Sequence, residues 1–120
     1  MVVRRIKTYT AETGFVYQYY FVGKRDALPN APEGPACEYV FDVTPDRKSM
    51  YAVSVFLQTE AADFWAQAHG RALSEAERYA AAKMRLLQGL DEIADIRISG
   101  RHLLVSSENI EEVLEVLELG

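Results

Sequence analysis

The stretch FVYQYYFVGKR, residues 15–25, carries five aromatic side chains among its first seven residues. Successive side chains of a β-strand point to opposite faces, so the odd and even positions of this stretch belong to different surfaces. The odd positions form the more continuous apolar row, which comprises Phe15, Tyr17, Tyr19 and Phe21. We therefore predict a strand whose odd row faces the core and whose even row faces a contact surface.

The rest of the chain divides by the period of its apolar residues. Alternating or β-branched segments predict strands at residues 2–10, 15–25, 37–44, 49–58, 95–99 and 102–106. Apolar residues at helical spacing predict helices at residues 59–69, 74–89 and 108–120. Runs of hairpins followed by helices indicate an α+β fold. We predict one domain over residues 1–120, an antiparallel sheet built from hairpins in the order ββββααββα, with the helices packed on one face.

Several residues are predicted to set the ends of these elements. Gly14 suits a tight connection between the first two strands, and Gly100 suits a two-residue hairpin turn. Thr59 is the expected N-cap of the first helix, which we expect to end at Gly70. Ser74 and Glu77 have the spacing of a capping box, and Gly89 is expected to end the second helix. The first two helices are therefore predicted with defined starts and stops.

The composition is that of a globular protein, with 49% hydrophobic and 26% charged residues in a chain of 120. The single cysteine, Cys37, cannot form an internal disulfide. The first residues show no signal-peptide pattern, and no apolar run approaches the roughly 20 residues that a membrane span needs. These features favour a cytoplasmic protein with no membrane partner.

The net charge of −5 is unevenly distributed along the chain. Residues 1–25 sum to +4, and residues 26–120 sum to −9. Such a division could attract partners of either sign. A mixed-sign surface is usual in soluble proteins, so we favour mutual neutralisation of the two regions, within the fold or across a dimer.

Motifs that would indicate an enzyme are nearly absent from the sequence. Neither a phosphate-binding glycine loop nor a metalloprotease or hydrolase motif is present. Tyr79 and Lys83 lie at i and i+4, a spacing that permits proton transfer, but core packing of Tyr79 is the simpler interpretation. His69, His102 and Cys37 are far apart in sequence, and local roles explain each of them. We therefore predict neither a cofactor nor a metal, and we favour a non-enzymatic function.

Three kinds of binding remain open. The basic, aromatic N-terminal hairpin suggests single-stranded nucleic acid, although the acidic remainder of the chain argues against it. A small-molecule pocket under the proline-rich loop of residues 29–35 would be lined by aromatic side chains, namely Tyr17, Tyr19, Phe41, Tyr51, Phe64 and Trp65. A protein interface would use the even row and the last helix, namely Gln18, Tyr20, Val22, Ile110, Val113 and Leu117. Tyrosine is enriched at such interfaces, and we favour a protein-interaction module that forms a homodimer.

Overall fold

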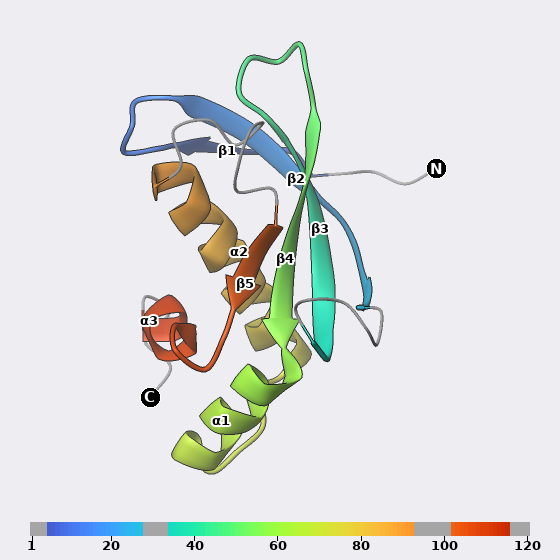
Figure 1. The fold of residues 1–120 in the computed structure, drawn as a ribbon. Coiled ribbons are helices and arrows are strands. Elements are labelled where there is room, and N and C mark those ends of the chain that lie inside the picture. The colour runs from blue at the N-terminus through green and yellow to red at the C-terminus, as the bar shows by residue number, and fades with distance from the viewer. Residues whose placement is uncertain (1–4, 28–33, 93–101, 116–120) are drawn as a thin grey trace.

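A computed structural model describes residues 5–27, 34–92 and 102–115 of the chain (Figure 1). Five strands and three helices lie in these ranges. Their bounds are β1 Lys7–Thr10, β2 Val16–Asp26, β3 Ala36–Thr44, β4 Tyr51–Gln58, α1 Thr59–His69, α2 Glu75–Glu92, β5 His102–Val105 and α3 Ile110–Glu115.

The strands form one sheet in the order β1-β2-β3-β4-β5. The first four strands pair antiparallel with their neighbours in sequence, which confirms the predicted α+β class and its hairpins. β5 differs, because it pairs parallel with β4, in the register Val55 to Leu103. The sheet is therefore mostly rather than wholly antiparallel. The predicted strand at residues 95–99 and the Gly100 turn lie outside the described residues.

The helices cover one face of the sheet, and the core lies between them. In Figure 1 α2 runs across this face, while α1 continues from the end of β4 and α3 lies beside α2. The alternate residues of the strands that point this way are buried, among them Tyr17, Tyr19, Phe41, Val53, Val55 and Leu103. The odd row of the aromatic strand is thus the core face, as predicted. Phe15 departs from that prediction, because it precedes β2 and its side chain is 53% exposed.

A β-bulge interrupts the alternation of β2. Phe21 lies opposite Phe41, but Val22 and Gly23 together face Val40. Beyond the bulge the parity is reversed, so that Lys24 lies opposite buried Tyr39 and Arg25 lies opposite Glu38. The two adjacent bases therefore belong to different faces of the sheet.

Two predicted helix ends need correction. Gln58, rather than Thr59, is the N-cap of α1, with no side-chain capping hydrogen bond. α2 continues past Gly89 to Glu92, so Gly89 does not end the helix. Gly89 instead faces β5, where a Cβ on it would lie 2.8 Å from a methyl carbon of Leu103. The glycine at this position allows β5 to approach α2 closely, instead of ending the helix.

The remaining end signals are confirmed. Gly14 and Gly70 both have the left-handed φ that their turns require, 95° and 73°. In the capping box, the Glu77 amide donates to the Ser74 hydroxyl at 3.2 Å, and the Ser74 amide donates to the Glu77 carboxylate at 2.8 Å. The Arg71 guanidinium also donates to Glu77 and is the main reason that the pKa of this carboxyl falls to about 2.

The tyrosine of β1 fixes the first hairpin to the end of α2. The Tyr9 hydroxyl donates to the Asp91 carboxylate at 2.7 Å, and the Glu12 amide donates to the same carboxylate at 2.9 Å. The bond to Asp91, together with burial, raises the pKa of Tyr9 to about 12. The hairpin is thereby held against the helical layer by contacts far apart in sequence.

Candidate functional site

The face of the sheet opposite the helices carries a group of exposed apolar side chains. No described helix packs on this face, whose residues are the even positions of β1, β3, β4 and the first part of β2. Val16 and Val22 of β2 are both exposed there. Ile6 and Met50 are also exposed and continue the same alternation just before β1 and β4. We call the group Ile6, Val16, Gln18, Tyr20, Val22 and Met50 the open-face patch.

Tyr20 lies at the centre of the open-face patch. It is opposite Asp42 of β3, and its hydroxyl donates to the Met50 sulfur at 3.4 Å. Gln18 lies between Thr8 of β1 and Thr44 of β3. Four of the six exposed large hydrophobic residues of the described chain belong to this patch, the others being Phe15 and Phe64. Apolar exposure is therefore concentrated on one face instead of being scattered over the surface.

The other half of the open face is largely buried and holds a charged group beside Phe56. Glu38 of β3 is only 8% exposed, and its carboxylate accepts hydrogen bonds from Arg25 at 2.8 Å and from the Ser54 hydroxyl at 2.6 Å. The bond from Arg25 is the largest cause of a lowered Glu38 pKa. His102 of β5 lies beside Ser54 in register, and its ring contacts Phe56 with the centroids 5.8 Å apart.

This polar cluster does not have the arrangement of a nucleophilic site. In a serine triad the histidine lies between the serine and the acid, and accepts the serine proton. Here the Ser54 hydroxyl donates to Glu38 directly, and the lowered pKa of that carboxyl makes it a weak base. The cluster therefore has a structural explanation, which is to satisfy a carboxylate buried on the sheet.

The predicted interface residues are separated by the fold. Gln18 and Tyr20 are half-buried and Val22 is exposed, all on the open face. Ile110 and Val113 are fully buried in the core formed with α2 and β5, so no surface of theirs is left for a partner. We therefore remove Ile110 and Val113 from the candidate interface. Leu117 lies outside the described residues.

The predicted pocket residues are mostly core residues. Tyr17, Tyr19, Phe41 and Trp65 are buried together in the core, and Trp65 also lines a hollow of about 280 Å³ with Glu111, Leu114 and Glu115 of α3. Tyr51 is half-buried at the start of β4. Phe64 differs from its neighbour Trp65 because its side chain is 46% exposed. Phe64 and Trp65 therefore line two separate hollows, and a pocket shared by all six predicted residues stays a prediction.

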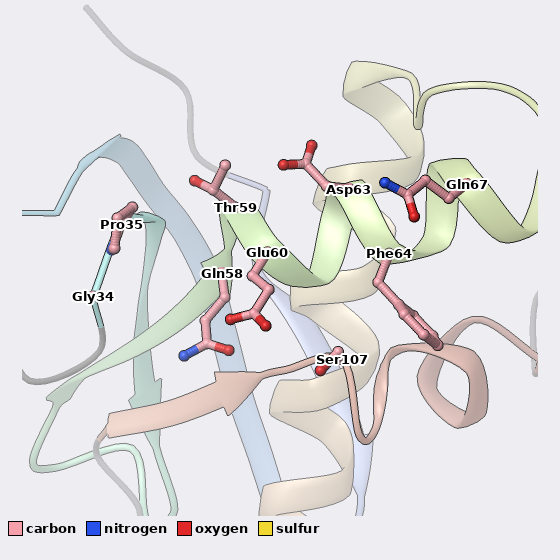
Figure 2. A pocket seen from close by; sticks show the side chains of 9 residues that line it. All are labelled: Gly34, Pro35, Gln58, Thr59, Glu60, Asp63, Phe64, Gln67 and Ser107. Carbon is pink, nitrogen blue, oxygen red and sulfur yellow. The ribbon is translucent and has the colours of Figure 1, made fainter.

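A hollow of about 620 Å³ does lie beside Phe64, where β4 passes into α1. Figure 2 shows Gln58, Glu60 and Phe64 directed toward the loop that carries Ser107. The remaining lining residues are Gly34, Pro35, Thr59, Asp63 and Gln67. Gly34 and Pro35 end the predicted lid loop, of which residues 29–33 lie outside the described chain. The hollow combines one aromatic ring with two carboxylates and two amides.

The basic residues near β2 are already engaged by acids. Lys24 forms an ion pair with Glu75 of α2, and Arg25 pairs with Glu38 at 2.8 Å. A phosphate backbone would have to compete with these carboxylates for both bases. The pairing therefore does not favour the nucleic-acid alternative.

The candidates for proton transfer and metal binding also occupy structural positions. The Tyr79 ring contacts Phe21 with the centroids 5.1 Å apart, and burial raises the pKa of Tyr79, opposite to the shift that a catalytic base needs. His69 stacks on Trp65 and is 2.8 Å from the Glu111 carboxylate. Burial also raises the pKa of the Cys37 thiol. In the described ranges, no three acidic, histidine or cysteine side chains gather as metal ligands would.

Comparisons with protein-family models, with curated proteins and with solved structures find no match to this chain. In the described part of the chain, none of the helices combines the length and the apolarity needed to cross a membrane.

The sequence pattern identified the centre of the open-face patch but missed its edges. These edges are Ile6 and Met50, which belong to the strands predicted at residues 2–10 and 49–58, and no local pattern brings them beside Tyr20. The cluster around Glu38 was missed as well. Its signal is weak, because Arg25 and Glu38 become neighbours only through the bulge in β2.

Proposed function

We propose that this chain is a protein-association module that binds through the open-face patch. The observation that carries the proposal is the concentration of exposed apolar residues around Tyr20, on the sheet face that no described helix covers. Contiguous exposed apolar surface of this kind marks interaction sites on soluble proteins. We also retain the prediction of a cytoplasmic location, which rests on the single cysteine.

The patch has the chemical character of a protein interface. Tyr20 offers a large ring with one polar atom, and Val16 and Val22 beside it offer apolar area with little side-chain entropy to lose. Gln18, Thr8 and Thr44 can form hydrogen bonds at the same surface. Interfaces combine apolar contact area with hydrogen-bonding groups, and both are present on this surface.

The proposal is tested by comparing wild-type protein with Val22→Lys and, as a matched control, Phe64→Lys. Both wild-type residues are exposed and apolar, at 40% and 46% exposure, but only Val22 belongs to the patch. The measurements are quantitative co-purification and molar mass by light scattering. We expect Val22→Lys to lose the associations of the wild-type protein and Phe64→Lys to keep them. Associations that survive Val22→Lys unchanged, or a wild-type protein that associates with nothing, would overturn the proposal.

A second candidate function is suggested by the hollow beside Phe64. An aromatic ring next to Glu60 and Asp63 suits a small organic cation, since the ring face and the carboxylates both favour positive charge. A thermal-shift screen with aliphatic and aromatic amines tests this function, because a ligand bound only to the folded state raises the unfolding temperature. A shift abolished in Glu60→Gln and kept in Val22→Lys would support it, and the absence of any shift would exclude it for these amines.

A further inference from the structure

We infer that the hollow beside Phe64 binds a guanidinium group in preference to a primary or quaternary ammonium group. This inference rests on the second candidate function and adds the chemical class of the cation. The hollow has three properties that favour such a group, namely a negative charge, one exposed aromatic ring and several hydrogen-bond acceptors.

The charge of the hollow is negative and is not neutralised within the described part of the chain. Of the nine described residues that line the hollow, only Glu60 and Asp63 are charged, and both are exposed. Neither carboxylate forms an ion pair with a described base, whereas Glu75 and Glu77 of α2 are both paired. A cation that enters the hollow therefore meets two carboxylates for which no described base competes.

Phe64 and Glu60 present a ring and a carboxylate side by side. They lie four positions apart on α1, a spacing that puts side chains on the same side of a helix. Figure 2 shows both directed toward the loop that carries Ser107. A planar guanidinium can stack on an aromatic ring while it donates two parallel hydrogen bonds to a neighbouring carboxylate.

Other organic cations use this pair of side chains less well. A quaternary ammonium donates no hydrogen bond and is typically held by a cage of several rings, but Phe64 is the only ring among the described lining residues. A primary ammonium is compact and strongly hydrated, so it gains less from a single ring than the weakly hydrated guanidinium does.

Further acceptors lie around the ring and the carboxylate. The side chains of Gln58, Gln67 and Ser107 line the same hollow, and each carries an oxygen that can accept a hydrogen bond. A guanidinium has five N–H donors in one plane, whereas a primary ammonium has three. The guanidinium can therefore use a carboxylate together with neighbouring amide and hydroxyl oxygens.

The backbone around the hollow is held by hydrogen bonds. The Thr59 amide donates to the Pro35 carbonyl at 2.9 Å, which joins one wall to the start of α1. The Ser106 amide donates to the Asn109 side chain at 2.8 Å, which closes the turn that contains Ser107. The hollow of about 620 Å³ has the size of a small-molecule site, and its backbone walls need little ordering when a ligand binds.

The first test compares three cations that carry the same butyl chain, namely butylguanidinium, butylammonium and butyltrimethylammonium. Binding is followed through the amide NMR signals of Phe64, Gln67 and Ser107 during titration of the isotope-labelled full chain. For butylguanidinium we expect a dissociation constant on the order of 1 mM, as for one small group in an open site, and binding at least about threefold weaker for the other two cations. Equal affinities for butylguanidinium and butylammonium would overturn the inference.

The second test assigns the binding to Glu60 and Phe64. Both side chains are exposed, so we expect Glu60→Gln and Phe64→Leu to fold, which circular dichroism checks. Each substitution should weaken the binding of butylguanidinium at least about threefold, because it removes the charge or the ring. Glu112→Gln is the matched control, since it removes an exposed carboxylate of α3 that does not line the hollow, and it should leave binding unchanged. Equal weakening by Glu112→Gln, or unchanged binding in both hollow variants, would contradict the inference.

A third measurement separates two sources of the guanidinium, a free small molecule and an arginine side chain of a protein. The probe is a blocked tripeptide of glycine, arginine and glycine, with lysine in place of arginine as the control. An arginine peptide that binds as tightly as butylguanidinium, and more tightly than the lysine peptide, supports a guanidinium presented by a protein. Binding of butylguanidinium without binding of the arginine peptide supports a free small molecule.

The inference and the function on which it rests can fail separately. If butylammonium binds as tightly as butylguanidinium and Glu60→Gln abolishes both, the preference for guanidinium is excluded and the binding of organic cations stands. If none of the cations shifts the amide signals around the hollow, both are overturned.

Discussion

The two faces of the sheet give neighbouring residues of β2 different roles. Tyr19 is 4% exposed and its ring makes an edge contact with Phe41 under the helical layer. Tyr20, the next residue, is half-buried on the open face and donates to Met50. Burial raises the pKa of Tyr19, as expected for a phenol removed from water. The comparison teaches that the face of the strand, and not the residue type, decides whether a tyrosine is buried in the core or remains at the surface.

The largest expected effect is on the covered face. Tyr19→Ala removes a buried ring from the core and should lower the free energy of unfolding by about 3–5 kcal/mol, the usual range for truncating a buried aromatic residue. Urea denaturation followed by circular dichroism measures this loss. A loss below about 1 kcal/mol would mean that the two faces do not differ as the structure indicates.

A smaller effect is expected at the buried carboxylate of the open face. Glu38→Gln weakens two hydrogen bonds to a charged group and should cost about 1–3 kcal/mol near pH 7. Because the pKa of Glu38 is lowered from 4.5, its contribution is complete above pH 4.5 and is lost as the pH falls through the lower folded-state value. The difference between wild type and variant should therefore shrink below pH 4.5. Denaturation curves that stay equally separated at every pH would contradict this assignment.

Tyr20→Ala is the open-face counterpart of Tyr19→Ala. At low protein concentration it should cost about 1 kcal/mol, because its ring is only partly buried in the single chain. At high concentration, self-association through the open-face patch would stabilise the wild-type protein but not the variant. Thermal unfolding at two concentrations separates these contributions. An unfolding temperature that rises equally for both proteins would place the contact elsewhere.

The smallest effect is expected for Val22→Thr, a change of similar shape on the open face. Within one chain it should alter the free energy of unfolding by less than about 0.5 kcal/mol, as for most surface substitutions. The added hydroxyl should still weaken any association through the open-face patch measurably, because burying it without a hydrogen-bond partner is unfavourable. Sedimentation alongside denaturation checks both parts. A loss of chain stability larger than that of Tyr20→Ala would reverse the order of the comparison.

Local patterns in the sequence were sufficient to predict most of the fold. The alternation in β2 correctly assigned Tyr17 and Tyr19 to the core, and the capping box correctly started α2. These features depend on residues a few positions apart, so a single sequence contains them. The parallel pairing of β5 with β4 could not be predicted in this way, because it joins strands separated by two helices.

The candidate site was less predictable because it depends on contacts between distant segments. Phe64 and Trp65 are consecutive, and helical spacing alone allowed both into one apolar stripe, whereas α1 turns only Trp65 into the core. The hollow beside Phe64 also needs Pro35 and Ser107, which no local pattern connects. Gly89 was wrongly predicted to end α2 for the same reason, because its close contact with Leu103 of β5 cannot be recognised from nearby residues.

The bulge in β2 has a consequence for the length of the strand. The additional residue at Val22 and Gly23 is what sends Lys24 toward Glu75 and Arg25 toward Glu38. Deleting that one residue would restore a regular ladder and exchange the faces of the two bases, leaving both acids without their cations. The strand therefore tolerates changes of residue type more readily than a change in the number of its residues.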